Sequence, residues 1–459
     1  MPLSDFLRRS KGITGTKVVC AEGDCGACTV LQATPQPGAE VRPVFLSINS
    51  CIAFMHTVDC SSLVTIEGLK RGEQLNALQN AMVKHHGAQC GFCTPGIVMA
   101  LEELVESKKQ FNEKNIKNYL SGNLCRCTGY QTIINAAMDI KQSGLGSLAK
   151  TYLTDSILRD LVGTQKIPLA MESSAFEFSA PVDIEAAIAF NAGAKDTRIL
   201  AGATDLGVQI NKRKTSPKRI LSLKNISSLY ELSVEDGHIY VGSRVTLDSF
   251  QKFISDKLPE LDNFLNIFAS KQIKNLGTVV GNIVNASPIG DIPPALMVLN
   301  AEIEVQGLKQ KRVIDINNFF LGYRKVDLKP SEVVTRLVIP IPKNRTMFKI
   351  YKVSQRRDLD ISCVSAAFLC FADKKNITEL RIAYGGVGAT VLRLNSVESK
   401  FKGIAKKEFY NPFNVNQVVN EIEKNITPIT DVRGSKKYRR VLAGRLYKKF
   451  VFECRERKI

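Results

Sequence analysis

The sequence predicts a multidomain protein of the α+β class, and three observations point to this class. The chain has 459 residues, which is too long for one ordinary hydrophobic core and sufficient for several domains. Apolar residues make up 44% of it and charged residues 23%, as in globular proteins. Helix-like and strand-like periods alternate along the sequence in an order that predicts a β-rich module, a helical module, a linker and two mixed modules.

The first 142 residues divide into the β-rich and the helical module. Residues 1–72 are rich in Gly, Thr and Val and contain short strand-like runs at 28–31 and 64–66. In residues 73–142 the apolar residues recur at helical spacing. This spacing predicts a four-helix module, with helices near 75–82, 95–105, 115–120 and 132–140. Thr94 is predicted to cap the second helix, and Pro95 to be its first residue.

The remaining residues predict a linker and two mixed modules. Residues 143–174 keep no period and contain turn formers, which predicts a linker with a short helix near 154–161. Residues 175–342 alternate the two patterns, and residues 343–459 repeat the mixture. The expected elements are helices at 184–192, 415–424 and 436–450 and strands at 198–201, 219–222, 238–242, 362–371 and 379–384.

Composition argues against several classes of partner. The formal net charge is +19, but Lys and Arg are spread along the chain, so we expect no nucleic-acid partner. No apolar run is long enough to span a bilayer, and the N-terminal residues lack the pattern of a signal peptide, so we expect no membrane partner. These features predict a cytoplasmic protein.

The first cysteine group is Cys20, Cys25 and Cys28, with Cys51 more distant. Most of the 12 cysteines lie between Cys20 and Cys127, a clustering that favours metal binding over disulfides. The spacing C-x4-C-x2-C followed by a remote cysteine is that of plant-type ferredoxins. Small residues between these thiols suit a loop that wraps a compact cluster. The alternative is a zinc knuckle, which usually joins two close cysteine pairs.

The second cysteine group is Cys90 and Cys93, followed by Cys125 and Cys127. Two close pairs are compatible with zinc and with an iron–sulfur cluster alike. We interpret Cys93 and Cys127 as preceding helix starts, where free N–H groups and the helix dipole stabilise an anionic cluster. This context favours iron and sulfur. The other four cysteines, which lack partners at such spacing, are expected to be ordinary thiols: Cys60, Cys363, Cys370 and Cys454.

The motifs VVCAEGDCGACTV, NSC, TIEGL, QCGFCTPG and GNLCRCTGY together resemble the two-cluster iron–sulfur module of the xanthine dehydrogenase/aldehyde oxidase family. The resemblance implies a ferredoxin-like β-grasp domain and a helical domain, each with one [2Fe-2S] cluster. It implies that the helical cluster lies nearer a molybdenum centre and the other cluster nearer a flavin. It also implies the ligand set Cys20, Cys25, Cys28, Cys51, Cys90, Cys93, Cys125 and Cys127.

Two small-residue segments of the third module suit a flavin nucleotide. ILAGATDLG at 199–207 reads as a strand and a turn that brings backbone N–H groups to a pyrophosphate, although an ordinary tight turn has the same pattern. NLGTVVGNIVNASPIGD at 275–291 offers amides, hydroxyls and a carboxylate. With FASKQ, GYRK and RRDLDIS, both segments resemble the FAD-binding domain and C-terminal flavin subdomain of the same family.

By this resemblance, the pyrophosphate residues are Gly202, Ala203, Thr204, Asp205 and Leu206, and the other flavin-binding residues are Thr278, Gly281, Asn282, Asp291, Phe268, which would stack on the flavin, and Lys352, near its ring. Ala203 stands where the family more often has Gly. Phe268 has the alternative of a core residue, and Lys352 that of a solvated strand charge.

Two further patterns are interpreted as structural. The alternation in DLDIS predicts that Asp358 and Asp360 lie on the polar face of a strand, rather than act as an acid and a base. The segment AYGGVGAT resembles a dinucleotide fingerprint, but its third glycine would fall at Val391, so we discount it as a Rossmann site.

The resemblance implies an electron-transfer subunit. No molybdopterin domain follows Ile459, so the chain is similar to the small subunit of bacterial xanthine dehydrogenases. Hypoxanthine and xanthine would be oxidised to urate on a molybdopterin-binding large subunit, with no catalytic residue for that step in this chain. The chain would carry electrons through two [2Fe-2S] clusters to FAD and on to NAD+, within a heterotetramer of two small and two large subunits.

Other readings remain open at this point. The partner could instead oxidise aldehydes, carbon monoxide or aromatic CoA esters, and a basic zinc-binding interaction module is a remote alternative. Family members begin with about two strands before the segment that matches LSDFLRR, whereas here only Met1 and Pro2 precede it. We therefore expect the N-terminal hairpin of the first domain to be missing and the next strand to be exposed at the sheet edge.

Overall fold

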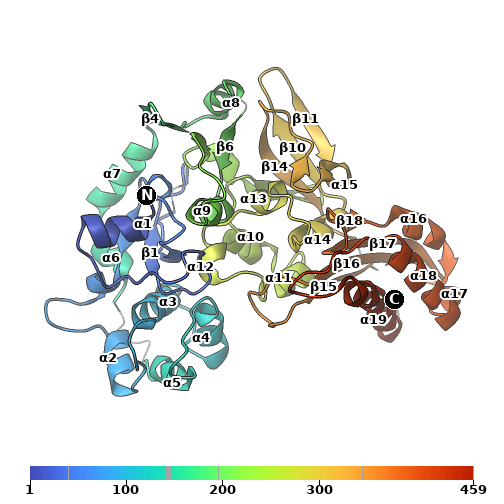
Figure 1. The fold of residues 1–459 in the computed structure, drawn as a ribbon, viewed down its shortest axis with the longest axis horizontal. Helices are drawn as coiled ribbons and strands as arrows, with labels where there is room; N and C mark the ends of the chain where they lie inside the picture. The colour runs from blue at the N-terminus through green and yellow to red at the C-terminus, as the bar shows by residue number, and fades with distance from the viewer. Residues whose placement is uncertain (40, 141–145, 195, 344–345, 458–459) are drawn as a thin grey trace. The chain divides into compact units, whose positions relative to one another are not determined.

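The computed structural model describes residues 1–39, 41–140, 146–194, 196–343 and 346–457 (Figure 1). These residues form two compact units. Unit 1 comprises residues 1–230, 246–248 and 269–278, and unit 2 comprises residues 231–245, 249–268 and 279–459. The protein is a mixed helix-and-sheet multidomain chain, as its sequence predicts.

The β-rich part of unit 1 is built on strands in the order β2-β1-β3, paired antiparallel. β1 is buried along its whole length, because α3 packs against it. Leu3 and Leu7, from the short helical turns at the N-terminus, pack with Val30 and Ile48 of the sheet. The elements are α1 (Leu3–Asp5), η1 (Phe6–Ser10), β1 (Thr29–Ala33), β2 (Leu46–Asn49), η2 (Met55–Thr57), β3 (Ser62–Val64) and η3 (Ile66–Leu69).

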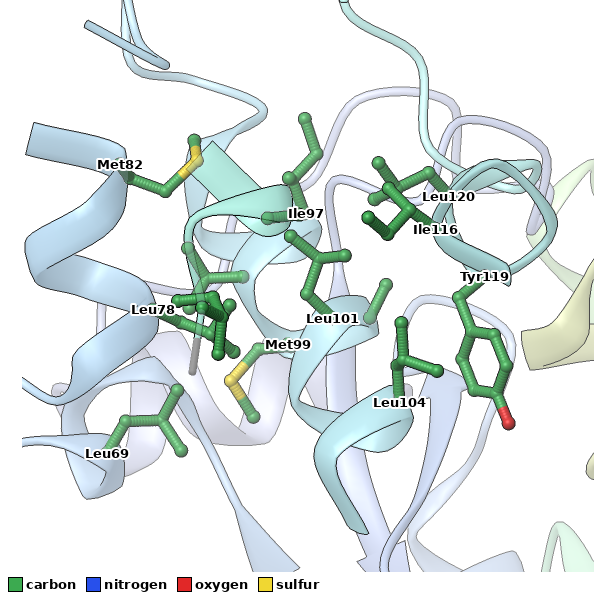
Figure 2. Packing of buried hydrophobic residues seen from close by; sticks show 14 of the residues in the cluster. Leu69, Leu78, Met82, Ile97, Met99, Leu101, Leu104, Ile116, Tyr119 and Leu120 are labelled. Atoms are coloured by element: carbon green, nitrogen blue, oxygen red, sulfur yellow. The ribbon is translucent and has the colours of Figure 1, made fainter. Parts of the chain in front are cut away.

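The helical part of unit 1 contains the predicted helices, which are α2 (Ala77–Lys84), α3 (Thr94–Glu106), α4 (Glu113–Leu120) and α5 (Gln131–Met138). Figure 2 shows Leu78, Ile97 and Leu101 converging with side chains of α4 in one buried cluster. Residues three and four apart lie on one face of a helix, which is why the spacing predicted these helices. Asn76 caps α2 in a capping box with Gln79.

The predicted cap of α3 is wrong by one residue. The helix begins at Thr94, and its N-cap is Cys93, whose backbone already has helical angles of φ −81° and ψ −17°. Pro95 lies in the first turn, where its missing N–H costs nothing. The hydroxyl of Thr94 is buried without a hydrogen-bond partner, so it does not cap the helix.

The segment predicted as a linker is packed onto unit 1 where the structure describes it, from residue 146 onward; residues 143–145 lie outside the described residues. It contains α6 (Leu148–Tyr152), α7 (Asp155–Gln165) and β4 (Leu169–Ser173). α7 is the short helix predicted near 154–161, and the side chain of Thr154 caps its N-terminus. Leu148 and Leu153 enter the core of the helical module. The hydroxyl of Tyr152 donates to the carbonyl of Gly68 at 2.6 Å.

The last part of unit 1 is a sheet in the order β4-β5-β7-β6, in which β5 and β6 run parallel to β7. Leu200 on β6 and Phe178 on β5 are buried between the sheet and its helices. The elements are β5 (Phe176–Ala180), α8 (Ile184–Ala192), β6 (Thr197–Leu200), α9 (Thr204–Asn211), β7 (Arg219–Ser222), η4 (Ser227–Tyr230) and α12 (Lys271–Lys274). α12 packs against β2, so a segment late in the sequence belongs to the fold of unit 1.

Unit 2 begins with a sheet in the antiparallel order β11-β10-β14-β9-β8. Its strands are β8 (Leu232–Glu235), β9 (His238–Gly242), β10 (Glu302–Gln306), β11 (Lys311–Asp315) and β14 (Val333–Pro340). The associated elements are α10 (Leu247–Ile254), α11 (Pro259–Leu265), α13 (Val279–Val284), α14 (Ile292–Val298), α15 (Ile316–Phe319), β12 (Phe320–Gly322) and β13 (Lys325–Val326).

The second sheet of unit 2 has the order β15-β16-β17-β18, and β19 also pairs with β17. α14 and α19 pack on β16, and Phe368 stacks on Phe450 between sheet and helix. The elements are β15 (Thr346–Val353), β16 (Val364–Ala372), β17 (Asn376–Gly385), β18 (Leu392–Arg393), α16 (Asn395–Glu398), η5 (Ser399–Phe401), β19 (Ile404–Ala405), α17 (Lys406–Phe409), α18 (Pro412–Lys424) and α19 (Lys436–Glu456).

Two sequence patterns of unit 2 differ in the structure from what local spacing suggests. Asp358 and Asp360 do not lie on a strand, so that interpretation is wrong: Leu359 between them has φ 61°, which interrupts an extended chain. The AYGGVGAT segment is a packing site, because a Cβ at Gly386 would overlap the carbonyl oxygen of Cys363. In the part of the chain that the structure describes, no helix has the length and apolar character needed to cross a membrane.

Candidate functional site

The first cysteine group forms where the loop before β1 meets the end of β2. Thr29 pairs with Asn49 in the antiparallel register, so the residues just outside this pair also lie side by side. The N–H and hydroxyl of Ser50 donate to the carbonyl of Cys28 at 3.3 and 2.7 Å. Strand pairing therefore brings the remote Cys51 next to the three clustered cysteines.

The loop that carries these thiols is shaped by glycine. Gly23 and Gly26 have φ of 75° and 68°, a left-handed conformation that side chains disfavour. The side-chain amide of Asn49 donates to the carbonyl of Gly23 at 2.7 Å and fixes the loop to β2. The small residues between the cysteines thus allow a backbone that folds around the thiols.

The thiols of this group lie against one another. A hydrogen bond with Cys25 lowers the pKa of Cys20, and a hydrogen bond with Cys51 lowers the pKa of Cys28. A thiolate is the form of cysteine that binds a metal. Cys51 is also hydrogen-bonded to Cys20, so the four thiols lie against one another, as ligands of one cluster would.

The second cysteine group joins the residues before α3 to those before α5. The Sγ atoms of Cys90 and Cys127 are 3.6 Å apart. Two thiolates on one tetrahedral metal lie about 3.7 Å apart, because metal–sulfur bonds measure about 2.3 Å. Burial and a hydrogen bond with Cys125 raise the pKa of Cys93 to about 12. Cys90 and Cys127 are exposed, and Cys125 is buried.

The helix ends near this group differ from the prediction at one of two places. Cys93 is the N-cap of α3, but Cys127 does not precede a helix directly, because α5 begins at Gln131 after Tyr130. Tyr130 has φ 71°, and this turn points its hydroxyl back to accept the N–H of Cys125 at 2.9 Å. The hydroxyl of Thr128 lies 3.1 Å from the Sγ of Cys125.

Both groups fit two-iron clusters in the arrangement of their donors. Within the described ranges, no three or more His, Cys, Asp or Glu side chains surround a single ion position. A mononuclear zinc site takes four ligands, whereas a [2Fe-2S] cluster takes two thiolates on each iron. Four thiols that lie close together in each group are the donors that such a cluster would take. The four cysteines expected to be ordinary thiols are all buried.

The candidate pyrophosphate residues of unit 1 lie in the turn after β6 and in the first residues of α9. Ala203, the N-cap of α9, has φ 60°, a left-handed conformation that glycine adopts without strain. A Cβ at Gly202 would overlap the carbonyl oxygen of Leu276, so the turn lies directly on the backbone of 276–277. Leu206 packs on the core of the parallel sheet and anchors the turn. The arrangement leaves backbone N–H groups at the start of α9 for an anion.

α9 also connects this turn to the first cysteine group. The side-chain amide of Asn211, at its C-terminal end, donates to the carbonyls of Ala21 and Cys51 at 2.9 and 2.7 Å. A Cβ at Gly207 would lie 2.5 Å from the carbonyl oxygen of Ile52. One helix of unit 1 therefore contacts the first thiol group and also begins at the candidate pyrophosphate turn. Sequence reasoning did not identify Asn211.

The flavin residues of unit 2 include a buried ion pair. Nζ of Lys352 lies 2.5 Å from Oδ2 of Asp291 and 3.0 Å from the hydroxyl of Ser362. The side chains of Lys352 and Asp291 are 2% and 6% exposed, so the alternative of a solvated strand charge is wrong. Phe268 is partly buried and stacks on Phe264 with ring centroids 6.3 Å apart.

Two buried oxygens without hydrogen-bond partners make this part of unit 2 suitable for a ligand with hydroxyl groups. Oδ1 of Asn282 and Oδ1 of Asp291 are buried without a hydrogen-bond partner. Buried acceptors without donors are costly, and ribityl or ribose hydroxyls would supply the donors. The predicted flavin residues therefore form two sets: Gly202 to Leu206 and Thr278 in unit 1, and Phe268, Gly281, Asn282, Asp291 and Lys352 in unit 2.

Three family models match the chain. They are described as "[2Fe-2S] binding domain" at residues 65–138, "FAD binding domain in molybdopterin dehydrogenase" at 174–342 and "CO dehydrogenase flavoprotein C-terminal domain" at 349–454. The second cysteine group lies within the first of these matches. The flavin residues lie within the second, apart from Lys352, which lies within the third.

A curated plant relative matches most of the chain. The xanthine dehydrogenase of Oryza sativa subsp. japonica is 30% identical over 476 residues, which cover 88% of this chain and 35% of the relative. The chain thus spans about a third of the length of that relative.

Two solved structures share the fold of about three fifths of the chain. Carbon monoxide dehydrogenase from Hydrogenophaga pseudoflava, in a form that lacks the Mo-pyranopterin moiety, matches with TM-score 0.57 and 23% identity over 61% of this chain and 96% of that one. Quinoline 2-oxidoreductase from Pseudomonas putida 86 matches with TM-score 0.55 and 24% identity over 62% and 98% of the two chains.

Proposed function

Because this chain belongs to the molybdenum hydroxylase family, with its [2Fe-2S] and FAD binding domains, we propose that it is the electron-transfer subunit of a xanthine dehydrogenase. Electrons from a molybdenum centre on a partner subunit would pass through two [2Fe-2S] clusters to FAD and then to NAD+. The observation that carries the proposal is that eight cysteines form two groups in which the thiols lie against one another.

The chain's own residues have defined tasks in this proposal. Cys20, Cys25, Cys28 and Cys51 would hold one cluster, and Cys90, Cys93, Cys125 and Cys127 the other. In unit 1, residues 202–206 would bind a pyrophosphate through backbone N–H groups, and Thr278 would bind a nucleotide. In unit 2, Gly281, Asn282 and Asp291 would accept or approach the hydroxyls of a flavin nucleotide, Phe268 would stack on a flavin ring, and Lys352 would lie near such a ring. FAD supplies the exchange between one-electron and two-electron steps.

The partner, substrate and acceptor are the finer parts of the proposal. Purine oxidation rests on the name of the curated relative, and the partner would be a molybdopterin-binding large subunit in a heterotetramer of two small and two large subunits. A carbon monoxide or N-heterocycle hydroxylase is the second candidate, favoured by the fold shared with the two solved structures. The reaction on the partner is decided by residues outside this chain.

The test is to load the full chain with iron, sulfide and FAD under anaerobic conditions and then to titrate it with NADH. We expect a brown protein with bound FAD and two distinct cluster signals in electron paramagnetic resonance (EPR) spectra after reduction. If NAD+ is the acceptor, NADH should reduce flavin and clusters in reverse. A colourless protein that binds zinc would overturn the electron-transfer function. Clusters that dithionite reduces but NADH does not would overturn only NAD+ as acceptor.

A further inference from the structure

A buried glutamine from the flavin segment reaches the loops of both cysteine groups. Gln272 lies on α12 in unit 1 and is 0% exposed. Its Nε2 donates to Oδ1 of Asn123 at 2.8 Å and to the hydroxyl of Thr29 at 3.3 Å. Asn123 precedes the Cys125 and Cys127 pair by two residues, and Thr29 follows Cys28 directly. One amide therefore holds a residue beside each group.

These contacts converge on the carbonyl of Gly26, between Cys25 and Cys28. Nδ2 of Asn123 donates to this oxygen at 3.1 Å, and the N–H and hydroxyl of Thr29 donate to it at 3.1 and 2.6 Å. A Cβ at Gly96, in the first turn of α3, would overlap the same oxygen. The first thiol loop is thus fixed against the helical module at a point with no room for adjustment.

A backbone hydrogen bond beside this point joins the two groups. The N–H of Leu124 donates to the carbonyl of Cys25 at 3.0 Å. Leu124 is covalently bound to Cys125. A candidate ligand of one cluster is therefore connected to a candidate ligand of the other through backbone atoms and one hydrogen bond.

Gln272 contributes through the hydrogen bonds that its Nε2 donates rather than through the volume that its side chain fills. Its Oε1 is buried without a hydrogen-bond partner, and a Cβ at Gly122 would overlap it. A buried acceptor without a donor is a cost that Leu or Met of similar volume would not carry. The chain accepts this cost at a site where Nε2 donates to both loops.

We propose that Gln272 is a positioning residue for electron transfer between the two clusters. It holds Asn123 and, through it, Gly26, so that the hydrogen bond from Leu124 to Cys25 keeps its length. The second set of cysteines would hold the electron donor and the first set the acceptor, and the transfer of one electron between them would break no bond and move no proton. The inference rests on the proposed function.

The test compares Gln272→Met with Gln165→Met in the loaded full chain. Gln165 is also a buried glutamine of unit 1, and its Nε2 donates to the carbonyl of Pro35 at 2.6 Å, with no contact to the cysteine loops among its hydrogen bonds. Both variants lose a buried amide of the same kind. Each protein is mixed with less than one equivalent of dithionite, and freeze-quench EPR follows how fast the electron equilibrates between the clusters.

We expect full iron content in both variants, unchanged equilibration in Gln165→Met, and about tenfold slower equilibration in Gln272→Met, because small displacements at a transfer site have large kinetic effects. Asn123→Leu should have the same effect, and the double variant should be no slower than either single one, since both act through one link. Wild-type equilibration in Gln272→Met would overturn the inference. Absence of clusters or of electron transfer in the wild type would instead overturn the proposed function.

A second measurement decides the case in which Gln272→Met fails to take up iron. Hydrogen exchange of the Leu124 amide is measured in the full-length chain without iron. We expect exchange at Leu124 to be about tenfold faster in Gln272→Met than in Gln165→Met, because the hydrogen bond to Cys25 opens more often. Equal exchange in the two variants would overturn the inference.

Discussion

Replacing Glu102 with Gln should stabilise unit 1 at high pH and have little effect at low pH. Glu102 lies on α3 and is 4% exposed. Burial, with the charge of Glu106 one turn away, raises its pKa from 4.5 to about 7. The side-chain amide of Asn76 donates to its Oε2 at 3.0 Å, which opposes this shift only in part.

The direction of the effect follows from proton binding. Between pH 4.5 and about 7 the folded state keeps the proton of Glu102, whereas the unfolded chain has lost it. The unfolded state therefore binds fewer protons, and the free energy of unfolding falls as the pH rises through this window. The loss amounts to about 3 kcal/mol above pH 7, at about 1.4 kcal/mol per pKa unit. A glutamine carries no charge in either state and removes this loss.

The assay is urea unfolding of the chain at about pH 5 and about pH 8. We expect Glu102→Gln to raise the free energy of unfolding by up to about 3 kcal/mol at the higher pH and by less than about 1 kcal/mol at the lower. Glu73→Gln, at an exposed position, is the control and should change neither value. An equal effect of Glu102→Gln at both pH values, or a loss of stability at the higher pH, would refute the reasoning.

Three further substitutions test the site, and two of them are compared with control variants. Cys127→Ser should remove the helical cluster and its EPR signal, whereas Cys60→Ser should keep the full iron content, because its thiol is not among the paired ones. Gly202→Ala should lower the FAD content, because its Cβ would overlap a backbone carbonyl. Gly163→Ala in α7, with open space around it, should instead raise the free energy of unfolding by about 0.5–1 kcal/mol. Lys352→Met should destabilise the flavin-free protein by about 3–5 kcal/mol in urea unfolding, because it leaves a buried carboxylate unpaired; a change no larger than that of an exposed lysine would contradict this.

The helices and the grouping of the cysteines could be predicted because both depend on local spacing. Apolar residues such as Leu101 and Leu104 mark one face of α3 at helical intervals. Cys20, Cys25 and Cys28 have the separations that a loop around one cluster requires. Two local predictions were wrong. The position of Thr94 does not reveal that Cys93 already has helical angles, and the alternation in DLDIS does not reveal that Leu359 is left-handed.

Contacts between distant segments could not be predicted from one sequence. Gln272 and Asn123 are 149 positions apart, and nothing near either residue indicates the other. Asn211 and Cys51 are 160 positions apart. The short motif CTGY contains Thr128 and Tyr130, but their roles depend on a left-handed turn that only the folded chain shows. Tertiary packing, not local preference, assigns these residues.

The contact of Gly26 with Gly96 limits how this chain can be recombined. Each glycine belongs to a different module: a Cβ at Gly96 would overlap the carbonyl oxygen of Gly26, and a Cβ at Gly26 would overlap the carbonyl oxygen of Gly122 in the helical module. A chimaera that joins the first 72 residues to a helical module from another protein would need glycine at both positions, even if every cysteine were retained. The two modules therefore have to be exchanged together, so that the contact between them comes from a single protein.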